Sequence, residues 1–425
     1  MLNADSWKRV GQTVARLSAV LLLSTLPLMP SAQAASNGTI LVCTQAGGDV
    51  QAAKDTLTAA GCTVIGEVPC QSGNFSILQV IPNNGNVAAA VAKFNGSIDA
   101  NILSAEATFQ SRSQFFFWPP RPTCTPNDPD YPSQYALPAM NWNDARCTLR
   151  LLGITQRAYP RVTVIDTGTN MVTPGDEMTS IQQFNFVGGL NGVSEAPLDS
   201  GVHGTACASI MAARTNNANF ISGGASYNLP VKITACRVSN DGETIDTLDV
   251  LRAMTWCVDH QRDRGGPGVI NLSINSTALP TYNGSSVVQA IAQAARKQGD
   301  LIVNGSGNLG VVDPSPEKYL RRVMAYDQDN NVASFSNTGP FKAGAPGVDI
   351  AVIAGNPAST LFGDGTSFSG PNWGSAICFL QSFVPWSNPV RLDNIVYQTA
   401  DNTAQGNKIP NFNRATIYTL LFGWW

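Results

Sequence analysis

Histidine is scarce in this sequence: only His203 and His260 occur among its 425 residues. Any reaction that uses an imidazole must therefore use one of these two side chains. Charged residues are also few, at 13% of the chain, and the net charge is -3. Because nucleic-acid binding needs a local excess of Lys and Arg, and none is present, we expect no nucleic-acid partner. No Cys-x-x-Cys or Cys/His pair with zinc-ligand spacing occurs, so we assign no metal ligands.

Long apolar runs are absent after residue 34, so we expect no membrane anchor in the mature chain. Before that point, three basic residues precede an apolar run at 17–29, and the small-residue triplet Ala32-Gln33-Ala34 follows. This pattern is typical of a signal peptide over residues 1–34. A membrane anchor is the alternative, but the run is shorter than the roughly 20 apolar residues that span a bilayer. We expect a secreted protein, extracellular or, in a Gram-negative source, periplasmic.

All nine cysteines follow the expected cleavage site, which places them in an oxidising compartment where disulfides persist. Their odd number leaves at least one thiol unpaired, and the connectivity does not follow from the sequence. Hydrophobic side chains make up 43% of the chain, enough to bury a large core. The composition indicates a globular protein with two or three units beyond the leader.

Residues 35–113 show the pattern strand, helix, strand, strand, helix, strand. The expected strands cover Thr39–Cys43, Cys62–Val68, Phe75–Ile81 and Ile102–Phe109, and the helices cover Val50–Ala60 and Val87–Phe94. This order predicts a small α+β domain with a ferredoxin-like fold. Residues 114–126 contain several prolines and the cluster Phe115-Phe116-Phe117-Trp118, so we expect an extended linker there.

From residue 127 to 425 the chain alternates apolar strands with helical segments. This alternation predicts an α/β domain with a parallel sheet and helices on both of its faces. The clearest strands cover Val162–Ile165, Val231–Ala235, Val269–Ile274 and Leu301–Val303. Helices are expected over Gly204–Ala213, Thr247–Arg262, Val287–Gln298 and Thr366–Phe383.

Three short segments carry the candidate chemistry, in the chain order Asp, His, Ser. They are Val164-Ile165-Asp166-Thr167-Gly168, His203-Gly204-Thr205 and Gly365-Thr366-Ser367. Three unrelated folds share a catalytic triad, and each has its own order of the three residues along the chain. The order Asp, His, Ser therefore favours one of these folds over the other two. Alone, Asp166 has an ordinary alternative as a turn former and Ser367 as a helix cap. His260 lies in a polar run near a helix end, so we expect a solvated surface residue.

These segments resemble the subtilase family of serine proteases. The resemblance continues at the family's spacing through Ser334-Phe335-Ser336-Asn337-Thr338-Gly339, Ala345-Pro346-Gly347-Val348 and Gly365-Thr366-Ser367-Phe368-Ser369-Gly370-Pro371. It implies a subtilisin-like peptidase domain over 127–425, whose last few dozen residues depart from the family pattern. It also identifies 35–113 as similar to the subtilase propeptide, a folding template and inhibitor. An independent ferredoxin-like module is the alternative there.

The resemblance implies a role for each candidate side chain. Ser367 would be the nucleophile, His203 the general base, Asp166 the residue that orients His203, and Asn308 an oxyanion donor together with the Ser367 amide. Substrate would add as an extended strand along Gly242-Glu243-Thr244 and Ser273-Ile274-Asn275, with Gly305-Ser306-Gly307 as a wall of the first specificity pocket. Cys207 resembles the free, buried thiol of the proteinase K branch, and we expect it to be inert.

Three positions depart from the family pattern. Asn275 stands where the family usually has glycine, which leaves the size and polarity of the pocket open. Ala206 stands where a second histidine is frequent, and Trp373-Gly374 replaces a small apolar pair. Many relatives bind structural calcium, but acidic residues such as Asp176 and Glu177 form no recognisable ligand loop. No cofactor is expected for catalysis.

The expected function is that of a secreted serine endopeptidase, made as a self-processing precursor. Its expected partners are peptide or protein substrates and its own propeptide, and we expect a monomer. Two alternatives stay open. One is a catalytically inactive homologue that only binds peptides, and the other is a related acyl-transfer enzyme such as a peptide ligase or an esterase.

Overall fold

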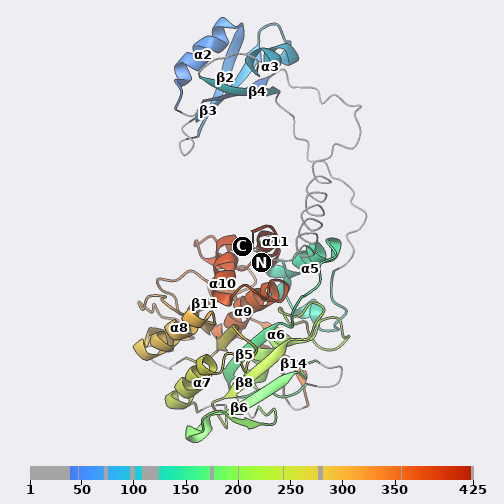
Figure 1. The fold of residues 1–425 in the computed structure, drawn as a ribbon, viewed down its shortest axis with the longest axis vertical. Coiled ribbons are helices and arrows are strands. Elements are labelled where there is room, and N and C mark those ends of the chain that lie inside the picture. Colours follow the sequence, from blue (N-terminus) through green and yellow to red (C-terminus); the bar gives the residue numbers. More distant parts are fainter. Residues whose placement is uncertain are drawn as a thin grey trace. The chain divides into compact units, whose positions relative to one another are not determined.

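The computed structural model describes residues 39–422 except 46, 71–74, 96–100, 108–123, 173–176, 200, 243, 276–280 and 356. The expected leader and most of the expected linker lie outside the described residues. The chain divides into two compact units, one that ends at Pro120 and one that begins at Arg121 (Figure 1). Among the described helices, none combines the length and the apolar character needed to cross a membrane.

The first unit has a four-stranded antiparallel sheet with strand order β2-β3-β1-β4. Its elements are β1 (Ile40–Thr44), α2 (Val50–Ala59), β2 (Cys62–Cys70), β3 (Phe75–Pro82), α3 (Val87–Asn95) and β4 (Ile102–Ala107). Alternate residues of β1 and β3, such as Val42 and Val80, are buried with Leu57 of α2. The side chain of Asp49 accepts bonds from two backbone amides of the first turn of α2, which explains why this helix begins there. The order of elements agrees with the predicted ferredoxin-like pattern.

The second unit is built on an eight-stranded sheet with strand order β12-β11-β10-β9-β5-β8-β6-β7. The strands are β5 (Arg161–Asp166), β6 (Ile181–Asn185), β7 (Val193–Glu195), β8 (Lys232–Arg237), β9 (Val269–Leu272), β10 (Leu301–Gly305), β11 (Arg321–Tyr326) and β12 (Gly344–Pro346). All neighbours are parallel except β6 and β7. The central strands are buried along nearly their whole length, as a parallel sheet covered on both faces requires.

Helices cover both faces of this sheet (Figure 1). On one face, α7 (Thr247–Asp259) and α8 (Ser286–Gln298) share a core with strand residues such as Ile270. On the other face, α6 (His203–Ala212) packs beside α9 (Thr366–Phe383), and Gly374 of α9 lies against Val269. Val269 and Ile270 are successive residues of β9, so they point to opposite faces. The α/β prediction is therefore confirmed.

The remaining elements surround this three-layer body. They are η1 (Tyr131–Ser133), α4 (Ala136–Ala139), α5 (Trp142–Leu151), η2 (Val187–Gly189), η3 (Tyr282–Gly284), the hairpin β13 (Ile350–Ala354) and β14 (Ser359–Gly363), α10 (Pro389–Thr399), β15 (Asp401–Asn402), β16 (Lys408–Ile409) and α11 (Phe412–Phe422). Cys124 and Cys147 form a disulfide that joins the start of this unit to α5. The thiols of Cys236 and Cys257 share a hydrogen bond, with their Sγ atoms 3.6 Å apart, and form no disulfide with each other.

A buried ionic cluster ties α9 to two neighbouring elements. Nε1 of Trp373 donates to the carboxylate of Asp393 at 2.9 Å, and the guanidinium of Arg321 donates to the same carboxylate at 2.6 Å. All three side chains are buried. The indole at position 373, where the family usually has a small residue, therefore supplies a hydrogen-bond donor between β11, α9 and α10.

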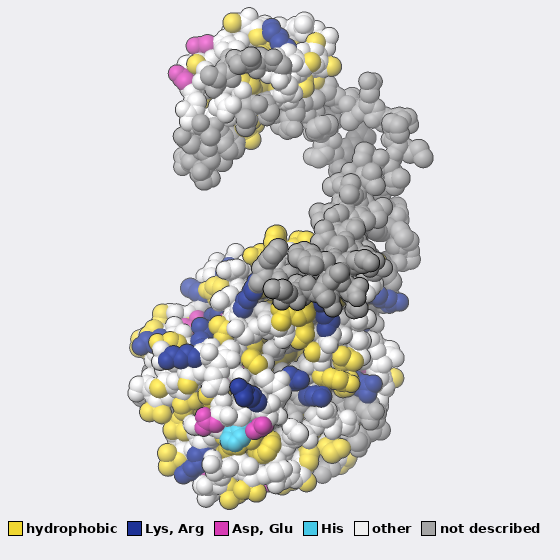
Figure 2. All heavy atoms as spheres, in the orientation of Figure 1, with side chains coloured by type: hydrophobic (Ala, Val, Ile, Leu, Met, Phe, Trp, Pro, Cys, Tyr) yellow, Lys and Arg dark blue, Asp and Glu magenta, His cyan; other side chains and the backbone are white. Residues whose placement is uncertain are grey.

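Lys and Arg side chains lie in separate groups over the face of the second unit that Figure 2 shows. No single basic patch stands out on that face.

Candidate active site

The candidate catalytic residues lie at one edge of the second unit's sheet. Asp166 is the last residue of β5, His203 the first residue of α6, and Ser367 the second residue of α9. The crevice outside the carboxyl ends of parallel strands is where open α/β sheets usually bind their ligands. The fold therefore brings together three residues that are far apart in the sequence.

Asp166 and His203 are joined directly. Nδ1 of His203 lies 2.8 Å from Oδ1 of Asp166, whose side chain is only 1% exposed. Oδ1 also accepts a bond from the amide of Thr167 at 2.7 Å. The carboxylate of Asp166 raises the pKa of His203 well above its usual value, because a nearby negative charge favours the imidazolium. This contact fixes which ring nitrogen faces away from the carboxylate.

Asp199 holds the two segments that carry this pair, and the sequence analysis missed it. One carboxylate oxygen of Asp199 accepts from the hydroxyl of Thr167 at 2.7 Å, and the other accepts from the amide and the hydroxyl of Thr205 at 2.7 and 2.5 Å. Thr167 follows Asp166, and Thr205 follows His203 by two positions. A single aspartate four residues before the histidine carries no pattern of its own, so only the structure reveals this link.

The backbone around His203 is tightly constrained. Val202 has φ of 55°, a left-handed conformation that is unfavourable for a β-branched residue. A Cβ on Gly204 would lie 2.0 Å from the carbonyl oxygen of Gly168, so the start of α6 packs directly against the turn after β5. Strained backbone at such a position is common in functional sites, where the surrounding structure holds it in place.

Ser367 and His203 are neighbours across the buried thiol of Cys207. Sγ of Cys207 lies 3.8 Å from Nδ1 of His203 and 3.5 Å from the carbonyl oxygen of Ser367. Oγ of Ser367 donates to the carbonyl oxygen of Ser273 at 3.3 Å. Within the described residues, no hydrogen bond joins this hydroxyl to the imidazole. Such bonds are often loose without substrate and tighten in the reacting complex.

Cys207 is a free, buried thiol, as the sequence analysis expected. It has no disulfide partner, is fully buried in α6, and burial raises the pKa of its thiol above the usual value. Asp166, His203 and Cys207 offer ligand atoms within 4.8 Å of one another. Because the imidazole and the carboxylate already bond to each other, we assign no metal to this cluster.

Asn308 lies beside the start of α9. A Cβ placed on Gly365 would be 3.6 Å from Nδ2 of Asn308, 3.6 Å from the amide nitrogen of Ser367 and 3.8 Å from Cβ of Ser367. These three atoms therefore surround one point next to the hydroxyl. Two N–H donors around one point at a helix start are suited to hold an oxygen that gains negative charge.

The structure places the expected substrate-binding segments as follows. The backbone of Gly242 packs against Gly201, next to the His203 segment, and the amide of Thr244 bonds to Asp241 at 2.8 Å. Glu243 lies outside the described residues. Ser273, Ile274 and Asn275 follow β9, and Gly305 ends β10. The segment from Gly305 to Gly307 lies against Thr366, and the buried hydroxyl of Ser306 points away, toward the carbonyl of Asn337 at 2.8 Å.

His260 takes no part in this site. It caps the C-terminus of α7, where its ring stacks on Trp256 at 4.6 Å between centroids and its Nδ1 lies 3.0 Å from the Trp256 carbonyl oxygen. The side chain is half-buried rather than fully solvated, which corrects the expectation of a freely solvated residue. His203 remains as the imidazole of the candidate site.

Structural calcium stays an expectation without an assigned ion. Glu177 is buried, its Oε1 has no hydrogen-bond partner, and Nδ2 of Asn217 donates to its other oxygen. Asp128 accepts bonds from the amides of Asn216 and Asn217 in the same loop. Asp176, the other acidic residue considered, lies outside the described residues. Oxygen ligands of this kind suit calcium, and Glu177 provides the unpaired oxygen.

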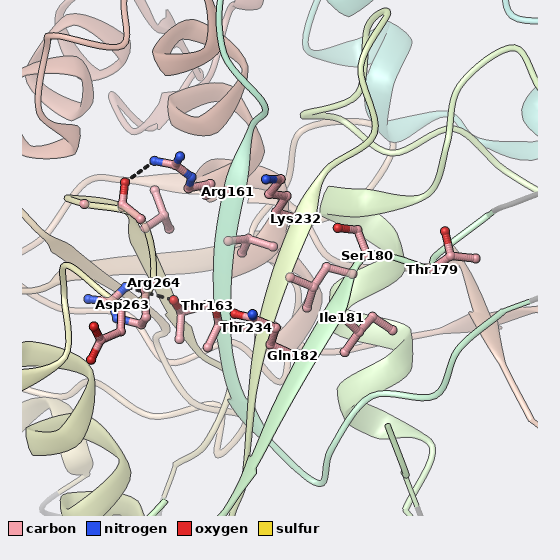
Figure 3. Close-up of a pocket in the computed structure, with 16 residues that line it drawn as sticks. Arg161, Thr163, Thr179, Ser180, Ile181, Gln182, Lys232, Thr234, Asp263 and Arg264 are labelled. Atoms are coloured by element: carbon pink, nitrogen blue, oxygen red, sulfur yellow. Dashed lines mark hydrogen bonds between the residues drawn. The ribbon is translucent and has the colours of Figure 1, made fainter. Parts of the chain in front are cut away.

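A cavity of about 330 Å³ lies at the opposite, amino-terminal ends of β5, β6 and β8 (Figure 3). Thr163 and Thr234, which pair across β5 and β8, line it, and Arg264 donates to the hydroxyl of Thr163 at 2.9 Å. None of the candidate catalytic residues reaches this cavity. We therefore assign it no part in the reaction.

Comparisons with known proteins point to one family. The model of the subtilase family matches residues 159–415. The chain is 27% identical to the thermophilic serine proteinase of Bacillus sp. (strain AK1) over 85% of this chain and 82% of that protein. It is 29% identical to thermitase of Thermoactinomyces vulgaris over 58% of this chain and 82% of that protein. Among solved structures, a protease of Pseudoalteromonas arctica has a TM-score of 0.57 and 21% identity, over 69% of this chain and 99% of that one.

Proposed function

The chain belongs to the subtilase family of serine proteases, and from this membership we propose that it is a secreted endopeptidase that matures by removing its own N-terminal region. The observation that carries the proposal is the 2.8 Å contact between His203 and the buried Asp166 beside the hydroxyl-bearing start of α9. An acid, a base and a nucleophile in this arrangement suit acyl transfer.

In the proposed reaction, Oγ of Ser367 attacks the carbonyl carbon of the scissile peptide bond while His203 takes its proton. Asp166 holds the tautomer and stabilises the imidazolium that forms. The Asn308 side chain and the Ser367 amide hold the oxyanion of the tetrahedral intermediate. His203 then passes the proton to the leaving amine, and water hydrolyses the acyl-enzyme by the same steps in reverse.

The first test is the fate of the precursor. We expect Ser367→Ala to stay at full length after leader removal, because self-processing needs the nucleophile. Its turnover of a peptide substrate should fall by about a millionfold, the loss found when the triad serine is removed from subtilisin. Amino-terminal sequencing and intact mass measure both leader removal and processing. Normal self-processing of Ser367→Ala would refute the assignment.

Active-site labelling separates the enzyme from an inactive, peptide-binding homologue. A fluorophosphonate should modify the wild-type protein and fail to modify Ser367→Ala. The exposed Ser133, whose hydroxyl bonds only to its own turn, supplies a matched control, and Ser133→Ala should be labelled like the wild type. Absence of labelling in all three proteins would favour the inactive homologue.

Product analysis separates hydrolysis from ligation and from ester cleavage. We expect new amino termini in a casein digest to increase without joined products, whereas joined products would favour a ligase. Turnover of simple esters alone, with intact casein, would favour an esterase.

A further inference from the structure

Two strand ends flank the nucleophile, and we call the space between them the crevice. The pairing of β9 with β10 runs as far as Leu272 and Asn304, and both chains then continue past Ser367. Ser273 exchanges two bonds with Ser367, one from its hydroxyl at 2.8 Å and one to its carbonyl at 3.3 Å. The amide of Gly307 donates to the hydroxyl of Thr366 at 3.1 Å. Both strand ends, and the space between them, therefore lie beside the reacting hydroxyl.

Three asparagine side chains bridge this crevice. Nδ2 of Asn275 donates to the carbonyl oxygen of Gly305 at 2.8 Å, which crosses from one strand end to the other. Nδ2 of Asn283 donates to the same carbonyl at 3.0 Å and to Oδ1 of Asn275 at 3.2 Å. Nδ2 of Asn304 donates to Oδ1 of Asn283 and to the carbonyl oxygen of Ile274, each at 3.2 Å.

The three asparagine side chains differ in how deeply they are buried. Asn283 and Asn304 are fully buried, whereas Asn275 is partly exposed and forms the outermost layer. A glycine at position 275 would remove the outer amide, although Asn283 would still donate to the carbonyl of Gly305. The Asn275 amide occupies the space beside that carbonyl and donates a second bond to it. A bulky group could enter only by displacing Asn275, which would break its bonds to Gly305 and Asn283.

We infer that Asn275 restricts the residue before the scissile bond to small side chains, namely glycine, alanine and serine. This inference rests on the proposed function, because it places that side chain in the crevice beside Ser367. The Asn275 amide occupies the space between the strand ends, and its hydrogen bonds hold it there. Large apolar side chains are excluded because they would have to displace Asn275, and its polar atoms would then lose their hydrogen-bond partners.

The test compares peptide p-nitroanilides of the form succinyl-Ala-Ala-Pro-X, with X as alanine, leucine or phenylalanine. We expect the wild type to show a higher kcat/KM for alanine than for phenylalanine, by about tenfold or more. Asn275→Gly should lower this ratio by at least about tenfold through a gain on the large substrates, and Asn275→Ala should give an intermediate ratio.

The matched control is Asn330→Gly, the same replacement at an exposed position with φ of 62°, which glycine adopts readily. Its ratio should equal that of the wild type. Fluorophosphonate labelling of each variant reports whether the active site has folded. Labelled wild-type enzyme that cleaves phenylalanine as well as alanine, or a labelled Asn275→Gly with an unchanged ratio, would overturn this inference alone. A wild-type protein that is neither labelled nor able to cleave any of the peptides would overturn the proposed function and this inference with it.

Discussion

Thr366 donates two hydrogen bonds to the side-chain oxygen of Asn308, one from its amide at 2.9 Å and one from its hydroxyl at 2.8 Å. Because Oδ1 takes both bonds, the orientation of the Asn308 amide is fixed. Its Nδ2 therefore points toward the position beside the Ser367 amide where we propose that the oxyanion forms. Thr366 is thus a positioning residue for Asn308, and it precedes the nucleophile by one position.

Replacing Asn308 by aspartate tests the oxyanion role. Asn308→Asp keeps the shape and the bonds from Thr366 but removes the N–H donor and adds a negative charge. We expect kcat to fall by about a hundred- to a thousandfold, the range found when the equivalent donor is removed from subtilisin, with KM changed much less. Steady-state kinetics measures both. Thr366→Val should cause a smaller loss in kcat, and a loss confined to KM in either variant would contradict the assignment.

The pH dependence of activity should follow the His203–Asp166 pair. The general base must be neutral, and Asp166 raises the pKa of His203 well above its usual value, so kcat/KM should rise with pH through that elevated pKa. Asp166→Asn removes the charge, so the midpoint should move to lower pH, and kcat should fall by about ten-thousandfold. The exposed Asp263 provides a control, since Asp263→Asn should leave the midpoint in place. An unshifted midpoint in Asp166→Asn would mean that another group controls the profile.

Glu177 should make the folded protein less stable as the pH rises. Burial raises its pKa from 4.5 to about 8, so between these values the folded state keeps a proton that the unfolded state releases. The free energy of unfolding should therefore fall across this window, by about 3 kcal/mol at pH 7. Urea unfolding of the Ser367→Ala protein in EDTA, at pH 5 and pH 8, measures the change, and Glu177→Gln should remove most of it.

Calcium chloride provides a second arm of the same experiment. An ion held by the ionised Glu177 would restore stability at pH 8 in the protein with Glu177 and have little effect on Glu177→Gln. Equal stabilisation of both proteins would place structural calcium elsewhere.

The cluster of Arg321, Trp373 and Asp393 should be essential to stability and not to catalysis. Asp393→Ala leaves the buried guanidinium of Arg321 without its main counter-charge, so we expect a loss of about 3–5 kcal/mol in the free energy of unfolding. Trp373→Phe, which removes only the N–H donor, should cost about 1 kcal/mol. Urea unfolding measures both losses. At low temperature the folded fraction should retain wild-type kcat, and a reduced kcat would show that α9 transmits the change to Ser367.

Local signals in the sequence predicted much of this fold, because they report on short-range physics. The helix starts at Thr247 and Ser286 follow residues whose side chains cap them, Asp246 and Ser285, and Gly299 ends α8 in a left-handed conformation. Strand β11 was not predicted, since it opens with two arginines. Arg321 can be buried because two carboxylates pair with it, Glu317 nearby and Asp393 far along the chain.

The sequence predicted the candidate catalytic residues, but it did not predict the residues that hold them in place. The motif order identified Asp166, His203 and Ser367, and the α/β fold brings them to one sheet edge. Asp199 and Asn283 escaped notice because their roles depend on which strand ends meet, and no local pattern encodes that. Asn275 stood out as a departure from the family, but its bond to Gly305 depends on the register of β9 with β10.

Helix α9 reaches the candidate site from a late part of the chain, after every strand of the eight-stranded sheet has been specified. Translation from the amino terminus therefore delivers the hydroxyl of Ser367 last. A nascent polypeptide that contains every strand of the sheet still lacks the nucleophile and the helix that covers one face of the sheet, so an incomplete copy cannot carry out the proposed reaction.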